Sequence, residues 1–329
     1  MSRTRCSGAL VDALREHGLQ VRWRNLVKWR RWFGRDIEIR LARREFHRYR
    51  PDLVFVFSRD LAPSLLAEFR KSARVVIWCE DSLEDLDSSY IDYFRQADLV
   101  CISNPERIAW LQEHGLANVT FLLSGFSPAY HRPLSPQAYV RDVAYIGGPG
   151  RKGQRAEFLH KVTERFDTEV FGLHWDRWTK TYPGLRCGGQ VKPRRYARIC
   201  ATSRIVLGTN QVNDDTCYFS NRTFLTLACG GFHLTHYVPQ LERVFTNGEH
   251  LGWFRNEDEA LDLIEHWLAR EDERRRVAAA GHDLVVRHHR YFHRVARILQ
   301  ILREGLPTDP TVGLGQPDQA QVASVDRVD

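Results

Sequence analysis

The sequence of 329 residues lacks three features that would assign it to a compartment or a class. No C-x-x-C pair occurs among its seven cysteines, and most of them lie in apolar runs, where cysteine behaves as a small buried hydrophobic residue. No apolar run approaches the roughly 18–20 residues that a membrane span needs. No apolar signal core follows Met1. The sequence therefore predicts a soluble, cytoplasmic protein in a reducing compartment, without structural zinc.

Most of the chain has no excess of positive charge. Lys and Arg number 48 and Asp and Glu 41; residues 1–50 hold 14 basic and 5 acidic side chains, which leaves 34 basic and 36 acidic in the other 279 residues. This distribution excludes a uniformly basic surface for nucleic acid but leaves a basic patch at one end. A hydrophobic content of 43% excludes global disorder, and the length fits two domains.

Short apolar runs alternate with helical patterns along most of the chain, which is typical of doubly wound α/β sheets. Each run is almost continuously apolar, as in parallel strands that are covered on both faces. In the first half, the predicted strands are Val21–Arg24, Asp52–Phe57, Arg74–Cys79, Asp98–Ser103 and Val119–Leu123. In the second half, they are Asp142–Gly147, Glu169–Gly172, Arg204–Gly208, Gly231–Thr235 and Leu251–Phe254. Towards the C-terminus, the pattern predicts helices over Glu271–Gly281 and His282–Glu304.

These elements group into two Rossmann-like domains, and the Pro-rich stretch between them predicts a linker. We expect an N-terminal domain over residues 1–124, a linker over 125–141, a C-terminal domain over 142–281, a terminal helix over 282–304 and a flexible tail over 305–329. The chain opens with a helical pattern over Gly8–His17, where such a domain normally has a buried strand. We expect that this strand lies upstream of Met1 or is missing. Ligands of such folds bind at the carboxyl ends of the strands, in the cleft between domains.

The densest motif is Ser220–Tyr237, with the sequence SNRTFLTLACGGFHLTHY. It predicts a loop, a short helix, a double-glycine stop and a buried strand. A helix that points its amino end at the cleft offers free amide groups to a phosphate, and Arg222 in its first turn adds a bidentate contact. An ordinary βα unit with Arg222 on the surface explains the pattern equally well, so the residues alone leave both interpretations open.

This motif resembles the C-terminal domain of the CgeB-type (spore-maturation, YkvP-like) glycosyltransferases, which are related to glycosyltransferase group one. The family motif reads roughly N-R-x-F-E-x-x-A-C-G-G-F-x-L-T. This sequence supplies Asn221, Arg222, Phe224, Ala228, Cys229, Gly230, Gly231, Phe232, Leu234 and Thr235. The resemblance extends over about residues 8–303, with specific matches in the second half and looser matches in the first.

The resemblance implies a GT-B fold, in which two Rossmann-like domains face each other and the C-terminal one binds a nucleoside-diphosphate sugar. It also implies that helix amides and basic side chains hold the diphosphate, with no metal or other cofactor. The turn that precedes three cations, Arg151, Lys152 and Arg155, agrees with this. The predicted donor-binding positions are Gly147, Gly148, Arg155, His174, Asn221, Arg222, Thr226, Gly230 and Gly231.

One position departs from the family pattern. Related retaining enzymes have a Glu that hydrogen-bonds the donor ribose where this sequence has Leu225. Loss of that carboxylate weakens nucleotide binding by about 1–3 kcal/mol unless Thr226 or Asp215 replaces it. An altered donor and a degraded enzyme therefore both stay open.

Two further groups of side chains have alternative interpretations. Asp81 follows the run Arg74–Cys79, where a carboxylate can position or deprotonate an acceptor hydroxyl, although capping of the next turn explains it too. His288, His289 and His293 lack an H-E-x-x-H glutamate and a third ligand, so we predict no metal site there.

The basic segment 22–50 interleaves Trp23, Trp29, Trp32 and Phe33 with Arg and Lys. One interpretation is a pair of solvated helices whose aromatic side chains are core. A second is a peripheral contact with an anionic membrane surface, where Trp lies at the level of the headgroups. A third is a nucleic-acid strand, which is disfavoured because no recognised binding motif is present.

Together these observations predict a metal-independent glycosyltransferase that moves a sugar from a nucleoside-diphosphate donor to a hydroxyl acceptor. The resemblance implies retention of configuration, and Asp81 is the candidate on the acceptor side. Two alternatives are a non-catalytic binding or structural protein on a decayed GT-B scaffold and a nucleotide-sugar epimerase.

Overall fold

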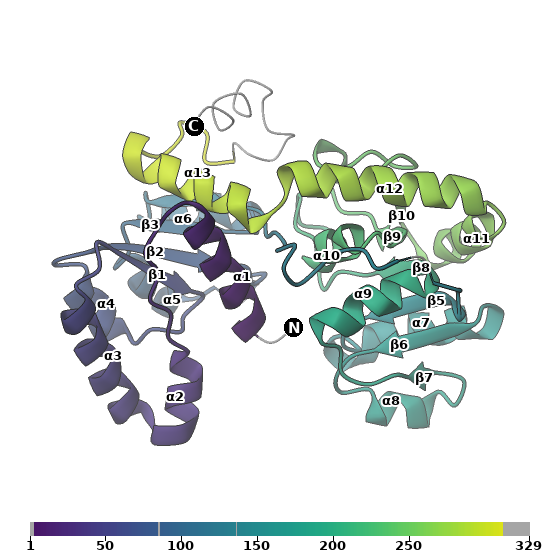
Figure 1. Cartoon of the computed structure of the whole chain (residues 1–329), viewed down its shortest axis with the longest axis horizontal. Helices are drawn as coiled ribbons and strands as arrows, with labels where there is room; N and C mark the ends of the chain where they lie inside the picture. The colour runs from purple at the N-terminus through teal and green to yellow at the C-terminus, as the bar shows by residue number, and fades with distance from the viewer. Residues whose placement is uncertain (1–2, 85, 136, 312–329) are drawn as a thin grey trace. The chain divides into compact units, whose positions relative to one another are not determined.

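The computed structural model describes residues 3–84, 86–135 and 137–311, which form two compact units (Figure 1). The first unit runs to Ser124 and takes in the C-terminal helix from Tyr291 onwards. The second unit runs from Gly125 to Arg290. Each unit has its own parallel sheet and its own hydrophobic core.

The first unit is built on four parallel strands in the order β1-β2-β3-β4. Because the strands follow each other in sequence and βαβ crossovers are right-handed, helices α4, α5 and α6 lie on the same face of the sheet. The elements are α1 (Arg3–Glu16), α2 (Leu26–Phe33), α3 (Arg35–Tyr49), β1 (Leu53–Phe57), α4 (Pro63–Phe69), β2 (Arg74–Cys79), α5 (Ser88–Phe94), β3 (Leu99–Ile102), α6 (Glu106–Glu113), β4 (Val119–Phe121) and α13 (Tyr291–Glu304).

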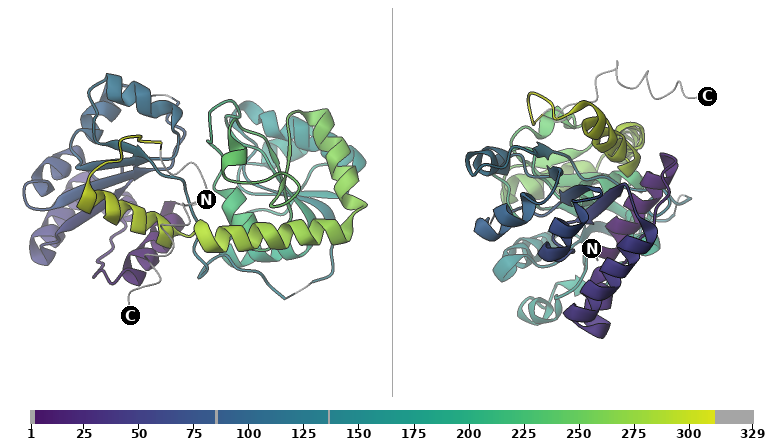
Figure 2. Two further views of the ribbon diagram at one scale, coloured as in Figure 1. Left: turned by 90° about the horizontal axis from the view of Figure 1, so that it is seen from above. Right: turned by 90° about the vertical axis from the view of Figure 1, so that its left-hand side faces the viewer.

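The other face of this sheet is covered by α1 and α13, which come from the two ends of the chain and pack side by side (Figures 1 and 2). Trp78 of β2 is fully buried beneath them and meets the ring of Tyr291 edge to face, 5.6 Å between centroids. The ring of His17 stacks on that of Phe292 at 4.1 Å. The apolar strand β2 is thus covered on both faces, as its sequence predicts.

The predicted strand over Val21–Arg24 is wrong, because these residues form the coil between α1 and α2. Their alternating arginines do not face a sheet: Arg22 and Arg24 both pair with Glu45 of α3, at 3.0 and 2.6 Å. The segment is therefore held against a helix by ion pairs. The interpretation of the neighbouring aromatic side chains as core is also wrong, since α2 has no buried residue and Trp32 is 61% exposed.

The second unit is built on six parallel strands in the order β10-β9-β8-β5-β6-β7. Strands β6 and β7 lie on one side of β5, and the later strands β8, β9 and β10 lie on its other side. The strand order therefore reverses between β5 and β8. The elements are β5 (Arg141–Ile146), α7 (Gln154–Arg165), β6 (Thr168–Phe171), α8 (Asp176–Thr181), β7 (Arg186–Cys187), α9 (Pro193–Ala201), β8 (Ser203–Gly208), α10 (Arg222–Ala228), β9 (His233–His236), β10 (Gly252–Phe254), α11 (Glu257–Leu268) and α12 (Glu271–His288).

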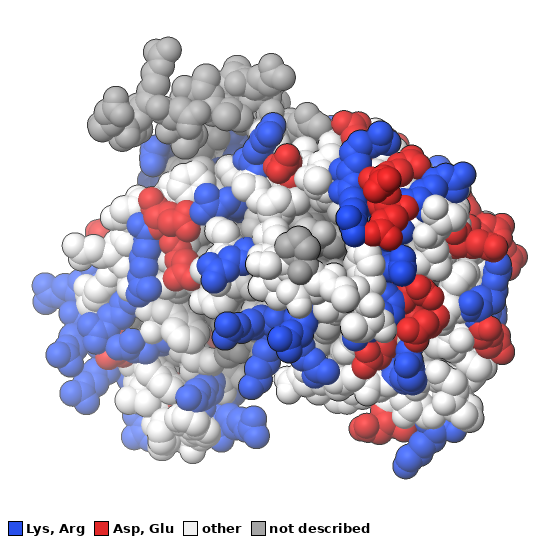
Figure 3. Space-filling model, turned by 45° about the vertical axis from the view of Figure 1, so that its right-hand side comes forward, with Lys and Arg blue, Asp and Glu red and all other residues white. Residues whose placement is uncertain are grey.

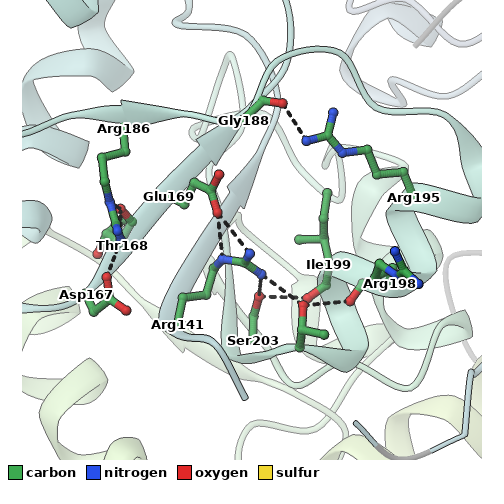
Figure 4. Close-up of polar contacts among 11 residues, drawn as sticks. Arg141, Asp167, Thr168, Glu169, Arg186, Gly188, Arg195, Arg198, Ile199 and Ser203 are labelled. Carbon is green, nitrogen blue, oxygen red and sulfur yellow. Dashed lines mark hydrogen bonds and ion pairs between the residues drawn. The ribbon is translucent and has the colours of Figure 1, made fainter. Parts of the chain in front are cut away.

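A polar cluster around Arg141 joins three elements at the amino ends of the central strands (Figure 4). The guanidinium binds the Glu169 carboxylate of β6 at 2.9 Å. It also donates to the hydroxyl groups of Thr202 and Ser203, both at 3.0 Å, where α9 leads into β8. Ser203 in turn donates to the carbonyl of Ile199 in α9 at 2.7 Å. One side chain thereby fixes the register of β5 between β6 and β8.

The predicted helix boundary at Gly281 is wrong: α12 continues to His288, and α13 begins at Tyr291. Gly281 lies inside α12 because a Cβ atom there would be 2.1 Å from the carbonyl oxygen of His250. Close packing against another segment explains this glycine, so it is no stop signal.

We expect Arg141→Ala to lower the free energy of unfolding of the second unit by about 2–3 kcal/mol, because Glu169 and two hydroxyl groups lose a charged partner. Arg186→Ala in β7 is the matched control: its pair with Asp167 is 60% and 47% exposed, whereas the Arg141 side chain is 12% exposed. The control should cost less than about 1 kcal/mol. Equal losses in urea denaturation would contradict the assignment.

Candidate functional site

The carboxyl end of β5 turns at Gly147–Gly148, at the position where the strand order reverses. The Gly147 amide donates to the carbonyl of Phe171 at 2.7 Å, and its carbonyl accepts from the indole of Trp175 at 2.9 Å. Gly172, at φ 153°, lies so close that a Cβ atom would be 2.1 Å from that same carbonyl oxygen. The turn is therefore held from β6 and from the loop that follows it.

Two arginines from different helices point to this turn. Arg155, in the first turn of α7, donates to the carbonyl of Gly148 at 3.4 Å. Arg222, the first residue of α10, donates to the carbonyl of Thr209 at 3.4 Å. A Cβ atom on Gly147 would lie 2.9 Å from Nη1 of Arg222 and 2.6 Å from the Tyr145 hydroxyl. Glycine at 147 therefore makes room for both side chains.

Burial lowers the pKa of Arg155; the Tyr145 hydroxyl opposes this shift, and the positive charge of Arg222 adds to it. Neither arginine forms an ion pair with a carboxylate within the described part of the chain. Two neighbouring cations without a carboxylate form a site that favours an anion. Its charge and its place at the reversal of strand order are those of a phosphate site.

A small hollow opens between β8 and α10 beside Arg222. Asn210 and Ser220 line this hollow, and the Asn210 Oδ1 accepts a hydrogen bond from the Ser220 amide at 2.9 Å. At the inner end lies His233, whose Nδ1 is 2.9 Å from the carbonyl of Val206 and whose Nε2 is 3.3 Å from the Thr223 hydroxyl. Burial lowers the pKa of His233 to about 4, so its ring adds no charge to the site at neutral pH.

The structure brings Gly147, Gly148, Arg155 and Arg222 together, with Asn221 immediately before α10. His174 lies in the exposed turn after β6, in a left-handed conformation at φ 70°, next to the Trp175 that binds Gly147.

Three other predicted donor-binding residues lie within α10 or just after it. The Thr226 hydroxyl is buried one turn inside the helix and bonds that of Tyr196 at 2.9 Å. Gly230 and Gly231 follow the other end of α10, before β9 starts. There Gly230, at φ 72°, ends the helix, and Gly231 packs against Cys200 and Thr226.

Leu225, where the family has a Glu, is 2% exposed and offers no polar group. Tyr145 was missed as a part of the site, because it reads as one more apolar residue of a buried strand. For Trp175 the sequence left two interpretations open, a contact near the donor base, which the resemblance implies, and a lid over the core. The sequence signal for both is their place two or three residues from a glycine turn at the end of a strand.

In the first unit, Asp81 follows β2 and accepts a hydrogen bond from the Ser58 hydroxyl at 3.0 Å. The cap of the next helix, α5, is Asp87, which accepts from the amides of Ser89 and Tyr90. Asp87, and not Asp81, therefore caps α5. Asp81 lies at the carboxyl edge of this sheet, and its role on the acceptor side stays a prediction.

Beside Asp81, the Glu80 carboxylate ties α13 to the sheet of the first unit. It accepts from the Ser124 hydroxyl at 2.7 Å and from the Tyr291 hydroxyl at 3.2 Å. Arg294, nearby on α13, donates to the carbonyls of Leu123 and Ser124 at 2.9 and 3.0 Å. Burial raises the pKa of Glu80 to about 7, with these hydroxyl groups and Arg294 opposing the shift and Asp81 adding to it.

Among the residues that the structure describes, no group of three or more His, Cys, Asp or Glu side chains is arranged to hold a metal ion. His289 instead stacks on the ring of Phe224, 4.9 Å between centroids. In the same part of the chain, every helix is too short or too polar to cross a membrane.

Comparison with known proteins bears on the fold and on the second unit. Residues 151–300, which include Arg155 and Arg222, match the family model described as glycosyl transferase-like. Sucrose-phosphate synthase from Thermosynechococcus elongatus superimposes with a TM-score of 0.62 at 12% identity, over 81% of this chain and 76% of that one. HepE from Anabaena, solved in complex with UDP and glucose, superimposes with a TM-score of 0.61 at 11% identity, over 89% of this chain and 88% of that one.

The fold is GT-B. A chain described as a possible UDP-N-acetylglucosamine 2-epimerase, from Listeria monocytogenes, matches too, with a TM-score of 0.54 at 12% identity over 92% of this chain and 94% of that one. No curated protein sequence matches this chain. The GT-B architecture with two Rossmann-like units is thus confirmed, and these distant likenesses leave the activity to be argued from the site.

We expect the stability of the first unit to depend on the ionisation of Glu80. Because the pKa is about 7 in the folded chain and about 4.5 for an ordinary Glu, the folded state binds the proton more tightly. Wild type should therefore lose stability relative to Glu80→Gln as the pH rises from about 4.5 to about 7, and the difference should be constant above that range. Chemical denaturation at intervals of half a pH unit measures it. Parallel curves for the two proteins would contradict the prediction.

Proposed function

We propose that the protein is a glycosyltransferase that takes a nucleoside-diphosphate sugar as its donor. The observation that carries the proposal is the pair of cations, Arg155 and Arg222, at the Gly147–Gly148 turn where the strand order reverses. The match of residues 151–300 to the glycosyl transferase-like model supports it. So does the HepE structure, which binds UDP on the same fold.

In this proposal the diphosphate lies between the two guanidinium groups, next to the amino end of α7. Negative charge grows on the diphosphate as the bond to the sugar breaks, so fixed positive groups stabilise the transition state more than the bound donor. The burial that lowers the pKa of Arg155 also removes competing water, which strengthens each contact. We propose that these arginines and the helix amides neutralise the leaving group without a metal ion or other cofactor.

On the acceptor side we propose a hydroxyl group that Asp81 positions or deprotonates, with retention of configuration as the resemblance to CgeB-type enzymes implies. The resemblance rests on the motif Asn221–Thr235, which forms α10 and β9. Leu225 leaves the donor ribose without the family's carboxylate, so we expect a looser hold on the nucleoside than on the diphosphate.

Arg155→Ala and Arg222→Ala should each weaken the binding of nucleoside diphosphates by about 10- to 100-fold, since each removes a charge-assisted contact. Isothermal titration calorimetry with UDP, GDP and dTDP measures this. Affinity for the matching nucleoside, which has no phosphate, should not change. The control is Arg276→Ala, an exposed arginine of α12 that should leave all affinities unchanged.

Absence of binding to all three diphosphates, or unaltered affinity in Arg222→Ala, would contradict the proposal. Product analysis separates the alternatives. Release of free nucleoside diphosphate from a sugar donor supports transfer, an isomerised donor indicates an epimerase, and binding without turnover indicates a decayed scaffold.

A further inference from the structure

Large apolar side chains gather on the surface of the first unit around α2. Val27, Trp32 and Phe33 are 42%, 61% and 48% exposed, and every residue from 31 to 37 is exposed. Trp23 and Ile37 flank them at 42% and 40%. Other exposed large apolar side chains of the described residues are scattered along the chain. Exposed apolar side chains in one place indicate an interaction surface.

Cations on α2 and at the start of α3 lie beside these apolar side chains. Lys28, Arg31 and Arg35 are exposed, and none forms an ion pair with a described carboxylate. The ammonium group of Lys28 lies over the Trp32 ring, 4.1 Å from its centroid. We call Val27, Lys28, Arg31, Trp32, Phe33 and Arg35 the α2 face. In Figure 3, blue side chains likewise predominate at the lower left, where α2–α4 lie, whereas both signs alternate over α11 and α12.

Helix α2 is held firmly while it presents these side chains. The Asn25 side chain caps it by accepting from the Lys28 amide at 2.9 Å. From its inner side, Arg30 binds Glu38 of α3 through two hydrogen bonds, at 2.6 and 2.9 Å, and Glu38 is 1% exposed. The acidic partner thus faces inwards and the free cations face outwards.

The helix pair also has a firm base. In α3, Phe46 stacks on Phe69 of α4, 3.9 Å between centroids, and Arg43 binds Glu68 at 2.8 Å. The two helices project together from that contact (Figures 1 and 2). Because α2 buries no residue, the folding of the unit does not explain its exposed aromatic side chains.

We propose that the α2 face docks on the surface of an anionic lipid bilayer. Trp and Phe side chains insert at the level of the headgroups, and the aliphatic Val27 adds apolar contact beside them. Lys28, Arg31 and Arg35 meet the lipid phosphates, which carry the opposite charge. The proposal involves the first unit alone and does not depend on the donor site.

Two other occupants fit the face less well. A second copy in a two-fold dimer would place the same cations against one another, because such an interface is self-complementary. A nucleic-acid strand would use the cations and stack on Trp32, but its bases and phosphates offer no partner for Val27 and Ile37.

The test is cosedimentation of the full-length protein, without nucleotide, with large vesicles of phosphatidylcholine alone or with 30% phosphatidylglycerol. We expect binding to the anionic vesicles that weakens at 0.5 M salt, and little binding to the neutral ones. Lys28→Ala with Arg31→Ala should lower the partition coefficient about 25-fold, at about fivefold for each cation. Trp32→Ser with Phe33→Ser should lower it about tenfold or more.

The matched control is Arg276→Ala with Arg287→Ala, which removes two exposed charges from α12 in the second unit and should change binding less than about twofold. Thermal unfolding of each variant establishes that the fold is intact, and donor binding should be normal in all of them. Equal binding of the Trp32/Phe33 variant and wild type would overturn the proposal. A dimer that persists at high salt and is lost in the same variants would also overturn it. So would a preference for single-stranded DNA over anionic vesicles, if the same substitutions abolish that preference.

Discussion

Two like charges held side by side without a carboxylate are the constraint around which the second unit is organised. Arg155 and Arg222 come from helices on different sides of β5 and repel each other, and burial adds to the cost. Packing holds them there: Gly147 leaves room beside Arg222, the Tyr145 hydroxyl donates to the Gly148 carbonyl, and Trp175 anchors the turn from the loop after β6. Two like charges held close together cost free energy, and a bound anion would relieve that cost, which is why this geometry supports the proposed phosphate site.

In the sheet of the second unit, the stabilising polar cluster and the candidate ligand site lie at opposite ends of the strands. At the amino ends, Arg141 joins β5, β6 and the start of β8 through a nearly buried cluster. At the carboxyl ends, strand reversal leaves the place where a ligand can reach backbone amides and both arginines. The first unit differs, since its carboxyl edge is stabilised by α13, which returns to it through Glu80, Tyr291 and Arg294.

Much of this could be predicted from the sequence, where local patterns decide the outcome. Runs such as Arg74–Cys79 are strands because they are apolar on both faces. The donor-binding turn at Gly147–Gly148 with Arg155 is predicted from the family resemblance together with the cations that follow it, and it stays a prediction. What failed depends on contacts distant in sequence. The coil at Val21–Arg24 is set by Glu45, and the continuity of α12 through Gly281 by His250. A hydrophobic periodicity does not reveal which distant residues come into contact. The exposed side of α2 could not be predicted for the same reason, because it is set by the ion pair between Arg30 and the buried Glu38 of α3.

The most direct test of the central claim is a crystal structure of the protein with UDP. The account predicts that the diphosphate lies at the Gly147–Gly148 turn, with oxygen atoms within hydrogen-bond distance of both Arg155 and Arg222. A structure in which the diphosphate lies elsewhere, and neither guanidinium group contacts a phosphate, would contradict it.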